Sequence, residues 1–188
     1  MGLIGGKLGY HILKAISADG QTGYMGNNVY AERSKLATLL GDNIWEETRD
    51  KVVIDFGCGT GVESVELAEH GAKKVIGVEI QDKRLQAARQ RADEHGVADR
   101  CLFTTEPVES ADVIVSLDSF EHFDDPAEIL RVMHSMLNPN GSVLTAFGPT
   151  WYHPLGGHLL SVFPWAHLLF TERALIMWRS TVRSDGAT

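Results

Sequence analysis

The stretch VVIDFGCGTG, residues 52–61, decides the fold of this chain. It opens with three β-branched residues, as expected for a strand that is covered on both faces of a sheet. Glycines then stand at every second position, and glycine accepts positive φ and lets a ligand approach the backbone closely. An apolar pattern with helical spacing, Val62, Val65 and Ala68, begins at once. The stretch therefore predicts a strand, a tight turn and a helix N-terminus whose free backbone N–H groups face a ligand.

An acidic residue follows at the end of the next predicted strand, KVIGVEI, which spans residues 74–80. Glu79 lies near its C-terminal end, 18 residues after Gly61. A carboxylate in this position can accept both hydrogen bonds of a ribose diol. The alternative is that Glu79 only caps the following helix. The complete strand–turn–helix–strand unit instead favours a site for a nucleoside-containing cofactor.

The glycine spacing discriminates between two kinds of cofactor. A dinucleotide fingerprint, G-x-G-x-x-G, requires glycine or alanine at position 62, where this chain has Val62. The pattern present is D-x-G-x-G-x-G, from Asp55 to Gly61. It resembles motif I of the class I S-adenosylmethionine (SAM)-dependent methyltransferases, and Glu79 resembles the acid of their motif II. A nicotinamide-dependent oxidoreductase is therefore the less favoured alternative.

Composition indicates one ordinary globular domain. The 188 residues are 44% hydrophobic and 22% charged, which is typical of such domains and enough for a substantial core. The net charge of −8 argues against a broad phosphate-binding surface, so no nucleic acid partner is expected. No apolar run has membrane-spanning length. There is no clear signal peptide, and Cys58 and Cys101 are predicted to be reduced thiols, so the chain is expected to be cytoplasmic.

Further helices and strands alternate along the chain and predict an open parallel α/β sheet. The blocks LDSFEHFDDP and LNPNGSVL resemble the post-strand-four and post-strand-five blocks of the broad type 11 methyltransferase group. The resemblance implies the Rossmann-like SAM-methyltransferase fold, an open parallel sheet with strand order 3-2-1-4-5. The expected segments are a charged helix, a third and a fourth strand, a turn and a fifth strand: 82–95, 100–104, 112–117, 138–141 and 142–147.

The resemblance covers residues 51–149, which form the predicted SAM-binding α/β core. Residues 1–50 are expected to be an N-terminal helical cap segment. Residues 150–188 are expected to be an apolar segment on the substrate side or an association surface. No sixth or seventh strand is predicted, so the fifth strand is an unpaired edge unless another part of the chain or another copy covers it. We therefore expect packing at this edge, or a homodimer through it or through the C-terminal segment.

The resemblance implies a set of cofactor ligands near the carboxyl ends of the strands, where open parallel sheets bind ligands. The glycines are expected to contact the methionine part of SAM, and Glu79 the ribose. Glu106 is the candidate for the adenine, and Asp118 flanks the amino-acid end. The full expected set is Asp55, Gly57, Cys58, Gly59, Gly61, Glu79, Ile80, Glu106 and Asp118.

Methyl transfer requires an acceptor aligned with the sulfonium methyl, and a base where that acceptor is a hydroxyl or a protonated amine. His122 is the candidate base, against the alternative that it only shapes its loop. Tyr152, His153 and His158 are candidates for the acceptor pocket, with packing on the apolar tail as the alternative. A metal site at residues 118–122 is less favoured because no metal-specific spacing is present, so no metal is expected.

The resulting hypothesis is a SAM-dependent methyltransferase that transfers a methyl group to a small-molecule acceptor. The shortened C-terminus leaves a second hypothesis open, a non-catalytic SAM-binding protein or a truncated methyltransferase fragment.

Overall fold

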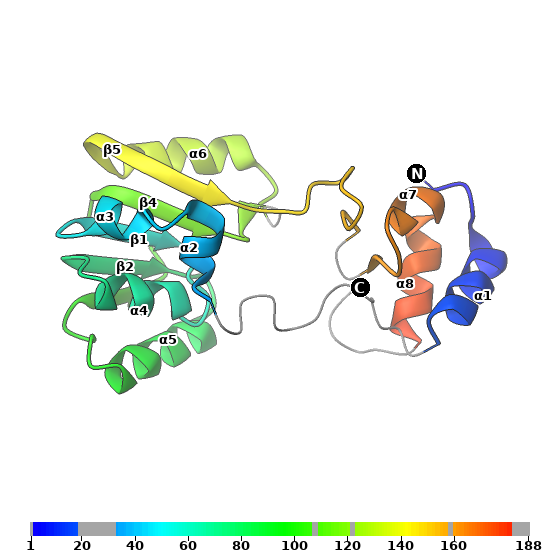
Figure 1. Ribbon diagram of the computed structural model, residues 1–188, viewed down its shortest axis with the longest axis horizontal. Coiled ribbons are helices and arrows are strands. Elements are labelled where there is room, and N and C mark those ends of the chain that lie inside the picture. Colours follow the sequence, from blue (N-terminus) through cyan, green and yellow to red (C-terminus); the bar gives the residue numbers. More distant parts are fainter. Residues whose placement is uncertain (1, 19–32, 107–108, 121–122, 158–159, 182–188) are drawn as a thin grey trace. The chain divides into compact units, whose positions relative to one another are not determined.

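The computed structural model describes residues 2–18, 33–106, 109–120, 123–157 and 160–181. The chain divides into two compact units, one formed by residues 32–147 and the other by residues 1–31 together with 148–188. In Figure 1 the larger unit runs from cyan to yellow, and the helices of the smaller unit are blue and orange-red. The division expected from the sequence kept the two ends of the chain apart, whereas the structure groups them in one unit.

A five-stranded parallel sheet forms the centre of the larger unit, in the order β3-β2-β1-β4-β5 (Figure 1). The predicted α/β class and strand order are confirmed. β1 and β4 are direct neighbours, so the order of the strands reverses between them, and open α/β sheets bind ligands at such a point. The strands are β1 (Val52–Phe56), β2 (Lys74–Val78), β3 (Cys101–Thr104), β4 (Ala111–Leu117) and β5 (Leu137–Ala146).

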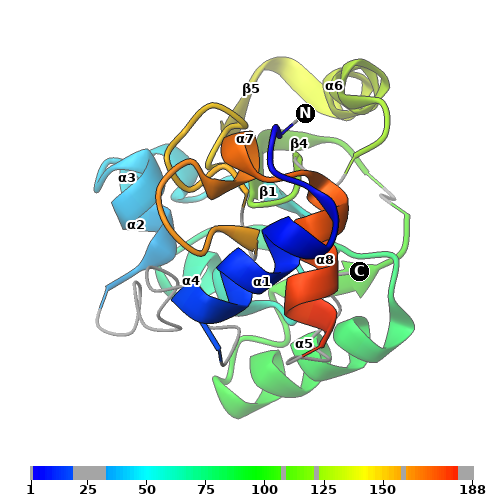
Figure 2. The same cartoon turned by 90° about the vertical axis from the view of Figure 1, so that its right-hand side faces the viewer.

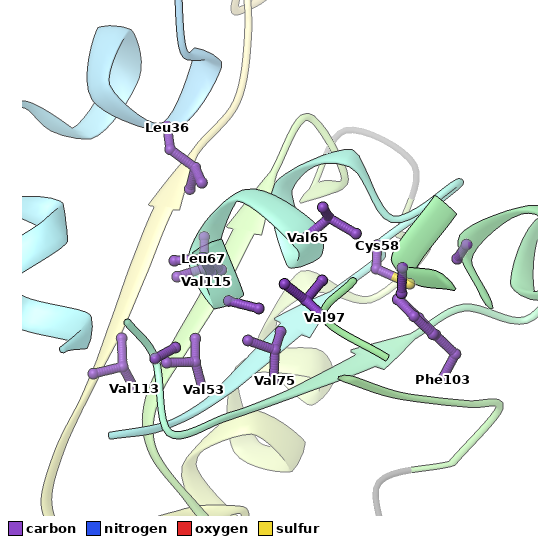
Figure 3. Packing of buried hydrophobic residues seen from close by; sticks show 14 of the residues in the cluster. Leu36, Val53, Cys58, Val65, Leu67, Val75, Val97, Phe103, Val113 and Val115 are labelled. Atoms are coloured by element: carbon purple, nitrogen blue, oxygen red, sulfur yellow. The ribbon is translucent and has the colours of Figure 1, made fainter. Parts of the chain in front are cut away.

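Two apolar cores cover the two faces of this sheet, as a parallel sheet requires. Successive residues of β1 point to opposite faces, so Val53 joins one core and Ile54 the other. Figure 3 shows the first core, in which Val113, Val53 and Val75 of three strands lie side by side. Its helices are α2 (Lys35–Leu40), α3 (Ile44–Thr48), α4 (Val62–Glu69) and α5 (Asp82–Glu94), and α6 (Pro126–Ser135) contributes to the second core.

β5 begins earlier than expected. Residues 138–141, expected to form a turn, lie within the strand, and the β4–β5 register shifts between Ala111 and Val113. One carboxylate satisfies polar groups at this irregularity: Asn138 Nδ2 donates to Asp112 Oδ1 at 2.8 Å, and Val52 N–H donates to Oδ2 at 3.0 Å. The segment therefore forms a bulge in the strand and not a turn, because tertiary hydrogen bonds hold it in the sheet.

The described part of the smaller unit consists of three helices joined by loops, with one isolated β-bridge between Ile4 and Phe170. α1 (Gly6–Ile16) lies along α8 (Glu172–Ser180), as Figures 1 and 2 both show, and α7 (Ala166–Leu169) precedes α8. Trp178 of α8 is fully buried, and its Nε1 donates to the carbonyl of Ser17, the residue after α1, at 2.8 Å. Every described helix is too short or too polar to cross a bilayer.

We expect Asp112→Ala to lower the free energy of unfolding of the larger unit by about 1–3 kcal/mol, because two donors lose their acceptor. The hydrogen bonds from Asn138 and Val52 also hold the pKa of Asp112 below its usual range. A lowered carboxylate pKa adds stability above about pH 4 that is lost as the pH falls through the folded-state pKa. Urea unfolding at pH 7 and pH 3 should therefore show a smaller difference between variant and wild type at pH 3.

The matched control is Asp93→Ala, at an exposed position of α5. A variant of Asp112 that unfolds at the same urea concentration as this control would show that the two hydrogen bonds add nothing.

Candidate functional site

The glycine-rich turn between β1 and α4 is fastened to the end of β2. Gly57 N–H and Cys58 N–H both donate to the Val78 carbonyl, at 2.9 and 3.0 Å. Glu79 is the next residue along the chain, so these two hydrogen bonds place its carboxylate beside the turn. Gly57 has φ 84°, and a Cβ there would lie 2.4 Å from Ser119 Oγ, so only glycine fits.

A cleft of about 490 Å³ opens beside this turn, at the carboxyl ends of β1, β2 and β4. It lies where the order of the strands reverses, and its size is within the range of small-molecule sites, about 300–1,000 Å³. Polar and apolar residues line it in similar numbers. The polar set, with the turn glycine, is Gly57, Glu79, Gln81, Arg84, Thr105, Asp118 and Ser119, and the apolar set is Phe56, Val78, Ile80, Phe123 and Val132.

Glu79 is the most buried carboxylate of the cleft, with 7% of its surface exposed. Gln81 N–H donates to Glu79 Oε1 at 3.0 Å, and Arg84 Nη1 lies 3.4 Å from Oε2. These contacts orient the carboxylate and leave lone pairs on both oxygens for further donors. Gln81 itself is the residue before α5, so the Glu79 side chain does not cap that helix.

Asp55 lies beneath the turn and does not line the cleft. It is 4% exposed, and Ser64 Oγ donates to Asp55 Oδ2 at 2.5 Å, which joins the end of β1 to α4. Burial, followed by the nearby Glu63 carboxylate, raises the pKa of Asp55 to about 7. The side chain therefore supports the turn from below and titrates near neutral pH.

An ion pair that the sequence did not predict lies at the rim of the cleft. Lys35 Nζ, from the first turn of α2, is 3.0 Å from Asp118 Oδ2 and 3.5 Å from Glu63 Oε1. Burial opposes the charge of Lys35, but the hydrogen bond to Asp118 and the Glu63 carboxylate outweigh it and raise the pKa of Lys35. Asp118 has φ 47°, and its N–H donates to the Ala146 carbonyl, which holds it at the end of β4.

Four of the predicted cofactor residues come together in the cleft: Gly57, Glu79, Ile80 and Asp118. Cys58 instead packs against Gly77 and Phe103, and burial raises the pKa of its thiol far above the usual range. The other predicted residues lie outside the lining as well, Asp55 and Gly61 in packed positions, and Gly59 and Glu106 at the surrounding loops.

The predicted acceptor and base residues fall into two groups. Tyr152 and His153 belong to the smaller unit, where both are exposed. His122 and His158 lie outside the described residues, as does Glu121 of the alternative metal site. In the part of the chain that is described, no three His, Cys, Asp or Glu side chains are grouped to hold a metal ion.

Sequence reasoning missed Lys35, Arg84 and the phenylalanines of the cleft. Arg84 follows the predicted strand end by one helical turn, so a search for cations in the first turn of α5 would find it. Lys35 has no signal in its own segment, because its partners Glu63 and Asp118 are distant in sequence.

The fold and the cleft together define an α/β protein built to bind a nucleoside-containing ligand at the carboxyl edge of a parallel sheet. Residues 30–178 match the family model described as a methyltransferase domain. The chain belongs to this methyltransferase family, and the predicted class, the SAM-dependent methyltransferases, is confirmed.

Two curated relatives are similar over about half of the chain. A ubiquinone biosynthesis O-methyltransferase of Neisseria meningitidis serogroup C is 34% identical over 104 residues, which are 52% of this chain and 44% of that protein. A ribosomal protein L11 methyltransferase of Pasteurella multocida is 37% identical over 100 residues, which are 50% of this chain and 33% of that protein. The chain thus spans less than half the length of either relative.

Solved structures share the fold at low identity. A SAM-dependent methyltransferase from Thiobacillus denitrificans in complex with S-adenosyl-L-homocysteine has a TM-score of 0.50 and 22% identity, over 72% of this chain and 53% of that one. The cyclase SpnF has a TM-score of 0.53 and 21% identity, over 75% and 56%. At this identity the similarity shows the fold alone.

Asp55→Asn should make stability less dependent on pH between about 4 and 7. The pKa of Asp55 is raised to about 7, so the folded protein keeps a proton that the unfolded chain, with a carboxyl pKa of about 3.9, releases in this range. Wild-type stability contributed by this group is complete below about pH 4 and is lost as the pH rises through 7. In urea unfolding at pH 4.5, 6 and 7.5, the free energy of unfolding of the variant should rise relative to that of the wild type as the pH rises. Parallel curves for the two proteins would contradict the raised pKa, and Asp93→Asn on exposed α5 is the control.

Proposed function

We propose that this chain binds SAM in the cleft beside Gly57 and transfers its methyl group to a small-molecule acceptor. The single observation that carries the proposal is the pair of hydrogen bonds from Gly57 and Cys58 N–H to the Val78 carbonyl. They set a glycine turn and the Glu79 carboxylate side by side in a chain of the methyltransferase family. A cytoplasmic location is part of this proposal, supported by two free cysteines.

The residues of the cleft fit the adenosine part of SAM. The Glu79 carboxylate has free lone pairs for the two ribose hydroxyls. Ile80, which is 84% exposed, presents an apolar surface on which a purine ring can pack, and Phe123 and Val132 line the same cleft. Glu106 remains a proposed partner of the adenine, because it follows Thr105 of the cleft lining.

The residues near Asp118 fit the amino-acid end. Asp118 lines the cleft and carries a negative charge, and the positively charged Lys35 is paired with it. Gly57 lets a ligand approach the backbone closely at the first position of the turn. Lys35 lies within residues 1–50, which supports the proposed role of this segment in holding the cofactor.

When bound, SAM supplies an electrophilic methyl group on its sulfonium. The protein then has to orient the cofactor, align the acceptor and exclude water. Glu79 and Asp118 would hold two separate ends of the cofactor and so orient it in the cleft. His122 is the proposed base for hydroxyl or protonated amine acceptors, and Tyr152, His153 and His158 are the proposed acceptor contacts.

A direct assay separates catalysis from binding alone. SAM binding is measured by calorimetry, and S-adenosylhomocysteine release is measured with a panel of phenols, catechols and amines and with a ribosomal protein as a macromolecular acceptor. We expect micromolar binding and turnover with one class of small molecule. Binding without turnover across the panel would favour the non-catalytic alternative, and tighter binding of NAD than of SAM would favour an oxidoreductase.

Glu79→Gln is expected to weaken SAM binding by about 10–100-fold, because the charged acceptor of the ribose hydroxyls is lost. The control is Glu94→Gln at the exposed end of α5. Equal affinity in both variants would show that the ribose is held elsewhere.

We also propose that the protein forms a homodimer through the free edge of β5. Among the described residues no strand pairs with that edge, since β5 ends the order β3-β2-β1-β4-β5. Residues 137–146 carry no charged side chain in a chain of net charge −8, so two copies can approach there without like-charge repulsion. The smaller unit supports the alternative route, because Trp151 and Tyr152 are at least half exposed.

Val143→Pro should dissociate such a dimer. The backbone groups of Ala146 point to β4, because its carbonyl accepts from Asp118 N–H. Backbone groups of successive strand residues point to alternate edges of the strand. The N–H of Val143, three positions earlier, is therefore directed to the free edge. Proline removes that donor and leaves the bonds to β4. Sedimentation velocity should show monomer for this variant and dimer for Leu130→Ala, an exposed position on α6. A wild-type monomer at high concentration would end the proposal.

A further inference from the structure

Lys35 and Asp118 form a partly desolvated ion pair at the rim of the cleft. The side chain of Lys35 is 22% exposed and that of Asp118 is 41% exposed, with 3.0 Å between Nζ and Oδ2. Glu63, whose side chain is 17% exposed, lies 3.5 Å from the same ammonium group. One cation thus serves two carboxylates, and only Asp118 of the two lines the cleft.

The position of Lys35 is built into the fold. Ser34 caps α2, its Oγ accepting from Ala37 N–H at 3.0 Å, and Leu36 is fully buried in the first core of the sheet. These contacts on both sides of Lys35 fix the first turn of α2. The ammonium group therefore stays within reach of Asp118 and does not extend freely into solvent.

We propose that Lys35 selects the zwitterionic amino-acid end of SAM by exchanging its partner. The inference rests on the proposed function of the cleft. The α-ammonium group of the cofactor takes the place of Lys35 on Asp118, and the α-carboxylate takes the place of Asp118 on Lys35. Glu63 stays beside Lys35 throughout. No proton is transferred and no covalent bond changes, so the charges in the site remain balanced before and after the exchange.

The exchange explains which ligands the site accepts. With a zwitterionic ligand, each half-buried charge that loses a partner gains another of the same sign, so none is stranded. A ligand with the ammonium group but no carboxylate competes with Lys35 for Asp118 and provides no new anion to pair with Lys35. A ligand without the whole amino-acid end, such as 5′-methylthioadenosine, leaves the Lys35–Asp118 pair closed and depends on Glu79 and the other residues that hold the adenosine part.

Calorimetry with three probes tests the proposal: S-adenosylhomocysteine, its decarboxylated analogue and 5′-methylthioadenosine. Lys35→Met, which keeps the chain length without the charge, should weaken S-adenosylhomocysteine binding by about 10–100-fold. It should leave 5′-methylthioadenosine within about twofold of wild type and should lower the preference for S-adenosylhomocysteine over the decarboxylated analogue. Lys35→Arg should restore most of that preference, and Lys83→Met on exposed α5 is the control.

The outcomes are distinct. If Lys35→Met binds S-adenosylhomocysteine as tightly as wild type does, the selection by Lys35 is wrong while the proposed function stands. If the variant loses all three probes equally, Lys35 has a structural role and the proposal is again wrong; thermal unfolding of the variant confirms this reading. If wild type binds neither S-adenosylhomocysteine nor 5′-methylthioadenosine, the proposed function itself fails.

Discussion

One backbone carbonyl, that of Val78, holds the site together. It accepts from two consecutive N–H groups of the turn after β1, and it stands at the end of β2, directly before Glu79. The turn can come this close only because Gly57 has no side chain, since a Cβ would collide with Ser119 after β4. The ends of β1, β2 and β4 therefore meet at this turn, and the cleft opens where they meet.

Carboxylates around this point have three different environments, although the chain as a whole is acidic. Asp55 is buried under the turn with a raised pKa, and Ser64 is its hydrogen-bond donor. Glu79 is buried but open to the cleft, between Gln81 N–H and Arg84. Asp118 stands at the rim and is paired with Lys35. Burial and pairing thus separate a supporting group, a ligand acceptor and an exchangeable ion pair.

The features that the sequence predicted correctly are those that short stretches of sequence encode. The strand order and the position of Glu79 follow from a glycine turn and from strands that alternate with helices, and both are local signals. The ion pair of Lys35 was not predictable, because its partners lie one and four strands further along the chain. The turn predicted at residues 138–141 was wrong for the opposite reason. The local turn preference is strong, but the hydrogen bond to Asp112 of β4 holds the segment in the sheet.

The smaller unit is assembled from both ends of the chain, with α1 packed on α8. During synthesis, α1 is made before the sheet but finds its packing partner α8 only after the whole sheet has been made. The larger unit is continuous in sequence and meets no such delay, so it can fold while the smaller one waits. Until α8 emerges, Leu13 of α1 lacks the apolar residues of 162–178 that bury it in the complete unit.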